Sequence, residues 1–254
     1  MWLNFALAKL VNTDGISWYY SLMKSISKGL WAGGALLFSF NLHGAVDIIF
    51  DYSYDTGNYF SDDRRYIMDQ VAYVFESRMN PTNFTAYRPV QDFGLNTVNA
   101  YLNFTSPSSA STLNPTIGST TSEGNVIGQA NELIIFLGAK SIAGSTLAQA
   151  GPTGLGYSFS EDITTWANAL DAKDSTTNFE PLAGKAQVNT NKTFYFDTDL
   201  TTHTDALSSG LTDFYTVMVH EIGHVMGFAN SASPTRNLAW KANISGSFWT
   251  GAKA

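Results

Sequence analysis

The apolar segment that begins at Asp213 constrains the fold more than any other part of the chain. Its later ionisable side chains are confined to His220, Glu221 and His224. Aspartate is a residue type that begins helices, and glycine, found here at Gly227, is one that ends them. In a helix, residues four positions apart lie on the same face, one turn from each other. The sequence therefore predicts a largely buried helix that presents two imidazoles together.

Three ionisable groups on such a helix are costly unless something compensates them, and a divalent cation does so directly. His220 and His224 have the spacing with which two imidazoles bind one zinc ion. Glu221 projects about 100° round the helix, within reach of a zinc-bound water. Zinc lowers the pKa of that water, and Glu221 then acts as the general base that passes the proton to a leaving amine. The alternative is a core helix whose histidines only form hydrogen bonds with their neighbours.

The nine residues from His220 to Phe228, HEIGHVMGF, resemble the active-site helix of zincin-type zinc metallopeptidases, particularly the metzincin clan. The resemblance implies an α+β, zincin-like fold, in which a twisted mixed sheet packs on helices that include the active-site helix. It also implies a Zn²⁺ cofactor and endopeptidase activity on a protein or peptide substrate. His220 and His224 would be metal ligands, Glu221 the catalytic residue and Gly227 the turn glycine. The longer chain is similar to exported bacterial metalloprotease-like proteins.

The sequence departs from the metzincin pattern at the third zinc ligand. The pattern has His or Asp three residues beyond the glycine, where this chain has Asn230. Residues 231–254 contain no His, Asp or Glu, and no methionine follows Met226. A catalytic zinc ion normally has three protein ligands and a water molecule. One ligand is therefore missing from the motif.

Three explanations for the missing ligand remain open. The chain is truncated before a subdomain that carries the ligand, or the ligand lies upstream, or the site is degenerate and uses Asn230 weakly. His203 is the first upstream candidate, followed by Asp197, Asp199, Asp205 and Asp213. With two firm ligands we expect weak zinc retention. A non-catalytic cell-surface or binding module on a degenerate zincin scaffold is the alternative function.

The N-terminal region has the three parts of a secretory signal peptide. Lys24 and Lys28 precede an uncharged apolar run from Gly29 to Phe40, and the segment Asn41-Leu42-His43-Gly44-Ala45 follows. This run is shorter than the roughly twenty residues that span a bilayer. We expect a signal peptide at 23–45 and a catalytic domain at 46–254. Residues 1–22 are then an N-terminal extension that arises from a wrongly assigned translation start, with Met23 as the true start. The expected location is extracytoplasmic, secreted or on the cell surface; the alternative is an uncleaved membrane anchor at 16–42.

Composition excludes several other functions. The chain of 254 residues has 21 acidic and 14 basic side chains, a net charge of −7 that repels a phosphate backbone, so no nucleic-acid partner is expected. It has no cysteine, which removes disulfides, thiolate nucleophiles and cysteine-type zinc sites. Histidines and carboxylates therefore remain as the metal ligands.

The remaining pattern predicts an α+β domain, because strands and helices interleave irregularly. Alternating or β-branched apolar runs predict strands, and apolar positions at helical spacing predict helices. The predicted strands are 46–50, 98–104, 133–137, 157–159 and 193–197; the predicted helices are 64–79 and 163–170; and 105–125 is predicted to be a long surface loop.

Two further features carry less specific expectations. Five aspartates near the start of the domain offer oxygen ligands for calcium, although their spacing fits no EF-hand loop. Ordinary turn and helix-cap roles are the favoured interpretation. The Gly-rich segment Gly151–Phe159 is the candidate for the exposed strand edge on which such proteases bind an extended peptide. The aspartates are Asp47, Asp51, Asp55, Asp62 and Asp63.

Overall fold

The computed structural model describes residues 46–78, 99–158, 181–199, 207–228, 244–245 and 248–249. All of them belong to one compact unit, His43–Ala254. Two helices and a mixed sheet form this unit together with smaller sheets, so the α+β prediction is confirmed. The predicted signal peptide and the predicted helix at 163–170 lie outside the described residues.

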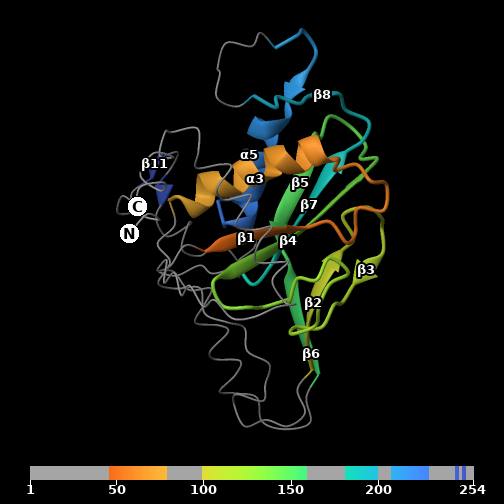
Figure 1. The fold of residues 1–254 in the computed structure, drawn as a ribbon, viewed down its shortest axis with the longest axis vertical. Helices are drawn as coiled ribbons and strands as arrows, with labels where there is room; N and C mark the ends of the chain where they lie inside the picture. Colours follow the sequence, from red (N-terminus) through yellow and green to blue (C-terminus); the bar gives the residue numbers. More distant parts are fainter. Residues whose placement is uncertain are drawn as a thin grey trace, which may run out of the picture. The chain divides into compact units, whose positions relative to one another are not determined.

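The main sheet has four strands in the order β1 (Asp47–Asp51), β4 (Glu132–Lys140), β7 (Gly184–Asn189) and β5 (Ala148–Pro152). The first three run parallel, whereas β5 pairs antiparallel with β7 (Figure 1). β1 and β4 are rich in Ile, Leu and Phe, as expected of strands buried on both faces. β5 is the edge strand, and no other described strand pairs with its outer side.

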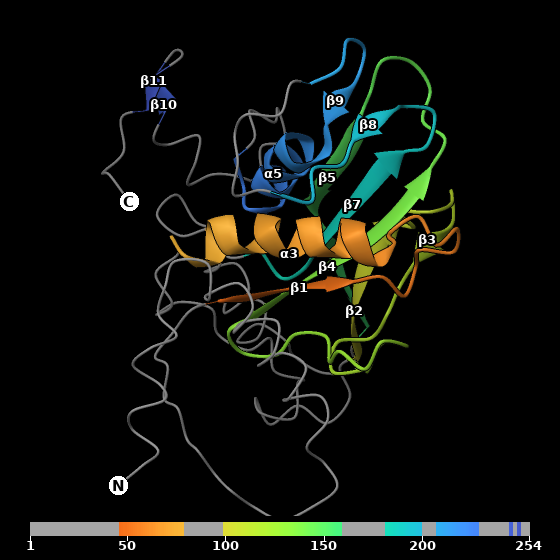
Figure 2. The ribbon, with the colours of Figure 1, turned by 45° about the horizontal axis from the view of Figure 1, so that its top comes forward.

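Helices α3 (Asp62–Glu76) and α5 (Phe214–Val225) cover one face of this sheet (Figure 2). The apolar spacing predicted α3 correctly, since Ile67 and Val71 are fully buried. Asp62 and Asp63 lie in its first turn, where carboxylates stabilise the helix dipole. Neither helix in the described part is long and apolar enough to cross a membrane.

A second sheet covers the opposite face of β4. Its order is β3 (Thr112–Leu113), β2 (Asn99–Thr105) and β6 (Gly154–Ser158). Leu102 and Phe104 point inward from β2, as their alternation predicts, and Phe104 stacks on Phe136 of β4 at 4.9 Å between ring centroids. The long loop predicted at 105–125 is corrected, because this segment contains β3 and buries Ile117 in the second core.

Short strand pairs complete the described structure. β8 (Phe194–Tyr195) pairs parallel with β9 (Thr212–Asp213), so the strand predicted at 193–197 is shorter than expected. β10 (Ile244–Ser245) pairs antiparallel with β11 (Phe248–Trp249). β9 leads directly into α5 and so fixes where that helix begins.

Candidate metal centre

Both ends of α5 are formed as the sequence predicts. The Asp213 side chain accepts a hydrogen bond from the Thr216 N–H at 2.8 Å, which caps the first turn. At the other end Gly227 has a φ of 88°, a conformation that glycine adopts without a Cβ penalty. The N–H of Phe228 donates to the Gly223 carbonyl at 2.9 Å, and the N–H of Gly227 donates to that of His224 at 3.2 Å. This Schellman turn ends the helix one turn beyond the first histidine.

The two histidines converge at the exposed side of α5. Their Nε2 atoms are 3.1 Å apart, and the ring planes are inclined at 82°. The Nδ1 of His224 lies 2.8 Å from the carbonyl of Phe228, which can only accept, so Nδ1 carries the proton. In the neutral ring Nε2 is then the acceptor, which the structure places in hydrogen-bond contact with His220 Nε2 and which is also the atom that can bind a metal. The helix-ending turn therefore fixes the His224 tautomer.

The spacing of the two nitrogens fits a zinc ion. With Zn–N bonds of about 2.0–2.1 Å, nitrogens 3.1 Å apart subtend an angle of about 98° at the ion. A tetrahedral site needs an N–Zn–N angle of about 109°. Side-chain rotations that move the two nitrogens apart by a few tenths of an ångström supply the difference. His220 is exposed and His224 half-buried, so both can be reached from solvent. The donor set present suits zinc.

Glu221 is buried, with 8% of its surface exposed, and faces β5. At the two ends of β5, the Asn189 N–H donates to the Leu147 carbonyl and the Thr153 N–H donates to the Ala183 carbonyl. The odd-numbered residues of β5 therefore bond toward β7, and the N–H groups of Ala148 and Ala150 point to the free edge. One of these, the Ala150 N–H, donates to the Glu221 carboxylate. Burial raises the pKa of Glu221, although His224, His220 and the Ala150 N–H oppose the rise. A raised pKa brings a carboxylate nearer to the range useful for a general base.

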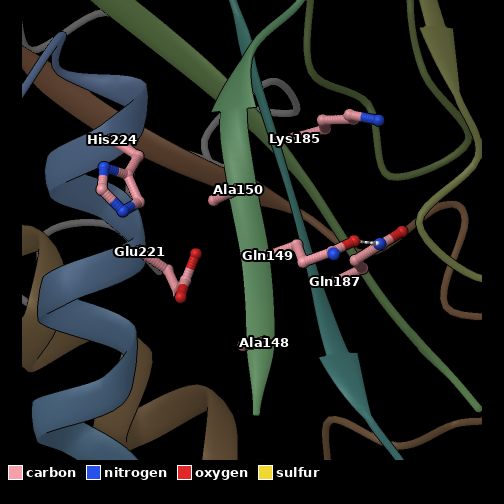
Figure 3. Close-up of a pocket in the computed structure, with 7 residues that line it drawn as sticks. All are labelled: Ala148, Gln149, Ala150, Lys185, Gln187, Glu221 and His224. Atoms are coloured by element: carbon pink, nitrogen blue, oxygen red, sulfur yellow. Dashed lines mark hydrogen bonds between the residues drawn. The ribbon is translucent and has the colours of Figure 1, made fainter. Parts of the chain in front are cut away.

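An open cleft of about 450 Å³ lies around this edge strand. Glu221 and His224 line it from α5, on the side of β5 that faces the helix (Figure 3). Gln149, Lys185 and Gln187 line it from the other side of the strand. The cleft therefore extends from the helix that carries the histidine motif, across the free edge of β5, to the opposite face of the sheet.

The described residues do not supply a third ligand. No group of three His, Cys, Asp or Glu side chains that could hold a metal ion occurs among them. The upstream candidate Asp213 caps α5, about 10 Å from His220 along the helix axis at about 1.5 Å per residue, and joins no such group. Asp197 bonds to the Asp199 N–H at 2.8 Å and joins no such group. The other candidates, His203, Asn230 and Asp205, lie outside the described residues.

The aspartates considered for calcium have structural roles where the structure describes them. Asp51 is fully buried and accepts hydrogen bonds from Thr121 Oγ1 at 2.6 Å and Asn125 Nδ2 at 2.7 Å. Asp55 accepts from the Phe60 N–H at 2.9 Å. The Asp51 carboxylate is engaged by protein donors, and Asp55 is engaged at Oδ2, whereas its buried Oδ1 has no partner among the described residues. These contacts agree with turn roles.

Several groups at the site have no signal in the sequence. The Phe228 carbonyl and the Ala150 N–H are backbone groups, and any residue type would supply them. Lys185 and Gln149 reach the cleft through strand pairing between distant segments. The edge beside Glu221 is Ala148–Pro152. Most of the candidate segment Gly151–Phe159 instead forms β6, which pairs with β2.

Comparison of the chain with protein-family models, with curated proteins and with solved structures finds no match. The function must therefore be argued from the geometry of the site.

Proposed function

We propose that this chain is an exported zinc-dependent endopeptidase. The observation that carries the proposal is the convergence of the His220 and His224 Nε2 atoms, 3.1 Å apart, next to a cleft that Glu221 and His224 line. A zincin-like fold is part of the proposal, supported by a mixed sheet with an antiparallel edge strand and the motif helix packed on one face. Export rests on the pattern of residues 23–45.

Each group at the cleft or beside it has a role in this reaction. His220 and His224 hold the zinc ion, which when bound would supply a Lewis acid that activates water and polarises the peptide carbonyl. Glu221 accepts a proton from the attacking water and delivers it to the leaving amine. The Ala150 N–H holds the Glu221 carboxylate in place. The free edge of β5 offers backbone groups on either side of that point, with which an extended peptide can pair.

Metal binding is the first test. Zinc is titrated into the chelator-treated full chain, and binding is followed by calorimetry and by thermal unfolding. At a hundred times the dissociation constant, one zinc ion adds about 2.7 kcal/mol of stability, which raises Tm by about 5–11 °C at about 2–4 °C per kcal/mol. His220→Ala and His224→Ala should each abolish the shift, whereas Lys192→Ala should retain it. Full-strength binding by both histidine variants would refute the site.

The same titration examines the third ligand. If His203 completes the site, wild-type zinc survives dialysis and His203→Ala loses it. If it does not, zinc is lost on dialysis in both proteins, the outcome that two ligands alone predict. N-terminal sequencing of secreted protein, with Val46 as the expected first residue, tests the export part.

Catalysis is tested with casein in the presence of zinc. Glu221→Gln should retain zinc and lose activity by about 10²–10⁴-fold, the usual contribution of a general base. Glu132→Gln is the matched control, because Glu132 lies on β4 away from the cleft and should leave activity unchanged. Zinc-loaded protein without hydrolysis would instead support the non-catalytic binding module.

A further inference from the structure

The side of β5 that faces away from the histidines carries polar groups that the proposed reaction does not use. Gln149 and Gln187 are partners across the β5–β7 ladder, and Gly151 is the partner of Lys185. Because side chains alternate between the faces of a sheet, all four positions share the face opposite Ala150 and Glu221. Figure 3 shows the drawn side chains of this set on that side of the strand.

Lys185 is a half-buried cation with no compensating anion among the described residues. Its ammonium group takes part in no ion pair there, whereas Lys140 donates to the carbonyls of Ser109 and Ser106 at 2.8 and 3.3 Å. Burial lowers the pKa of Lys185, and the nearby positive charge of Lys140 lowers it further. A negative charge brought to this position would relieve both effects.

Gln149 adds a second donor to the same face. Its Oε1 accepts from the Gln187 Nε2 at 2.5 Å, which orients the amide and leaves the Gln149 Nε2 without a partner among the described residues. Gln149 and Lys185 are diagonal neighbours across the ladder. Such neighbours lie about 7–8 Å apart, within reach of long side chains. A cation and an N–H donor together match the two oxygens of a carboxylate.

The glycine at position 151 leaves the path to Lys185 open. A Cβ built there would meet nothing within 4 Å. Neighbouring strands are about 4.8 Å apart, so a peptide paired with the free edge of β5 has its backbone about 9.6 Å from that of β7. Lys185 on β7 and a glutamate on the peptide, extended toward each other over Gly151, together span this distance of about 9.6 Å between the two backbones. The peptide residue opposite Gly151 directs its side chain to this face.

We propose that Gly151, Lys185 and Gln149 form a subsite that selects an acidic side chain of the bound peptide. The inference rests on the proposed function in one respect, which is that the peptide pairs with the edge of β5. The acidic side chain lies next in sequence to the residue opposite Ala150, and therefore next to the part of the peptide that faces Glu221. The predicted substrate class is an extended peptide with Glu or Asp at that single position.

Peptide binding tests the subsite independently of catalysis. Fluorescein-labelled, Thr- and Val-rich ten-residue peptides with Glu, Gln, Ala or Lys at one central position are titrated with the full chain in the presence of a chelator. Fluorescence anisotropy should show the Glu peptide binding about tenfold more tightly than the Lys peptide, since like charges in an interface are strongly disfavoured. Gln and Ala peptides should fall between them.

Variants assign the preference to the subsite. Lys185→Met should remove the preference for Glu, and Lys185→Glu should reverse it in favour of the Lys peptide. Lys192→Glu makes the same change of charge outside the cleft and should leave the preference intact. Gly151→Leu fills the open space without a change of charge and should weaken the Glu peptide most. Circular dichroism checks that each variant is folded.

The outcomes separate the two proposals. Loss of the Glu preference in both Lys185 variants supports the subsite, even if neither zinc nor hydrolysis is ever detected. Absence of peptide binding, equal binding of all four peptides, a preference for Gln over Glu, or an unchanged preference in Lys185→Glu overturns it, even if casein is cleaved.

Discussion

Gly184 of β7 lies in close contact with the helix that carries the histidines. A Cβ built on Gly184 would lie 2.4 Å from Val225 Cγ1 and 3.0 Å from its Cγ2. It would also lie 3.2 Å from Ile135 Cγ1. Ordinary contacts between carbon atoms are about 3.5–4.0 Å. Gly184→Ala therefore brings a methyl group more than an ångström too close to Val225.

Val225 has little freedom to move away. It is fully buried, and a valine in a helix strongly prefers one χ1 rotamer. The helix must shift or the side chain must adopt a poor rotamer, and overpacking of this kind costs about 1–3 kcal/mol. At about 2–4 °C per kcal/mol, Tm should fall by about 2–12 °C.

A double-mutant cycle isolates this contact. Val225→Ala removes both clashing methyl groups and by itself should cost about 1–3 kcal/mol, from lost burial and a small cavity. In Gly184→Ala/Val225→Ala the new methyl group occupies the vacated space. The double variant should therefore be more stable than the sum of the two single effects by about 1–3 kcal/mol. Urea unfolding followed by far-ultraviolet circular dichroism gives the free energies of unfolding.

Gly151→Ala is the matched control on the same sheet. Its Cβ would meet nothing within 4 Å, and its φ lies outside the positive range. We expect no loss of stability and a gain of up to about 1 kcal/mol, from the lower entropy of the unfolded chain. If the losses of stability in Gly184→Ala and Val225→Ala add to within about 0.5 kcal/mol in the double variant, the close contact between α5 and β7 at these residues is refuted.

Two further predictions concern the buried Asp51 and the half-buried Glu132. Asp51→Ala should lower the free energy of unfolding by about 2–4 kcal/mol, because it leaves buried donors such as Thr121 Oγ1 without a partner. Each unpaired donor costs about 1–3 kcal/mol, and the costs add incompletely. Urea unfolding in which Asp51→Ala is as stable as Asp63→Ala, a substitution of an exposed aspartate, would contradict this prediction. Burial and then the adjacent Asp47 raise the pKa of Glu132, so its ionisation costs stability as the pH rises above the ordinary value. Glu132→Gln should therefore gain a few tenths of a kcal/mol at pH 7, after allowance for solvent screening, and about nothing below pH 4. A gain that is independent of pH in thermal unfolding would refute this account.

The sequence by itself determined the local features. The helix α5, its Asp213 cap and its Gly227 turn follow from residue type and spacing within a few turns of the chain, and so does the shared face of His220 and His224. The alternation in β2 and the apolar spacing in α3 also depend only on near neighbours, and the structure confirms both. Such patterns are readable because the periods of helices and strands are fixed by backbone geometry.

Only the tertiary structure decided what surrounds the motif. It places the edge strand β5 beside Glu221, and it brings Lys185 and Gln149 to the far side of that strand. It also shows that the predicted surface loop at 105–125 contains the two-residue strand β3 and contributes Ile117 to the second core. The physical reason is that strand pairing joins residues distant in sequence, and backbone N–H and C=O groups such as those of Ala150 and Phe228 are the same in every residue. A sequence pattern therefore carries no record of them until the sheet is assembled.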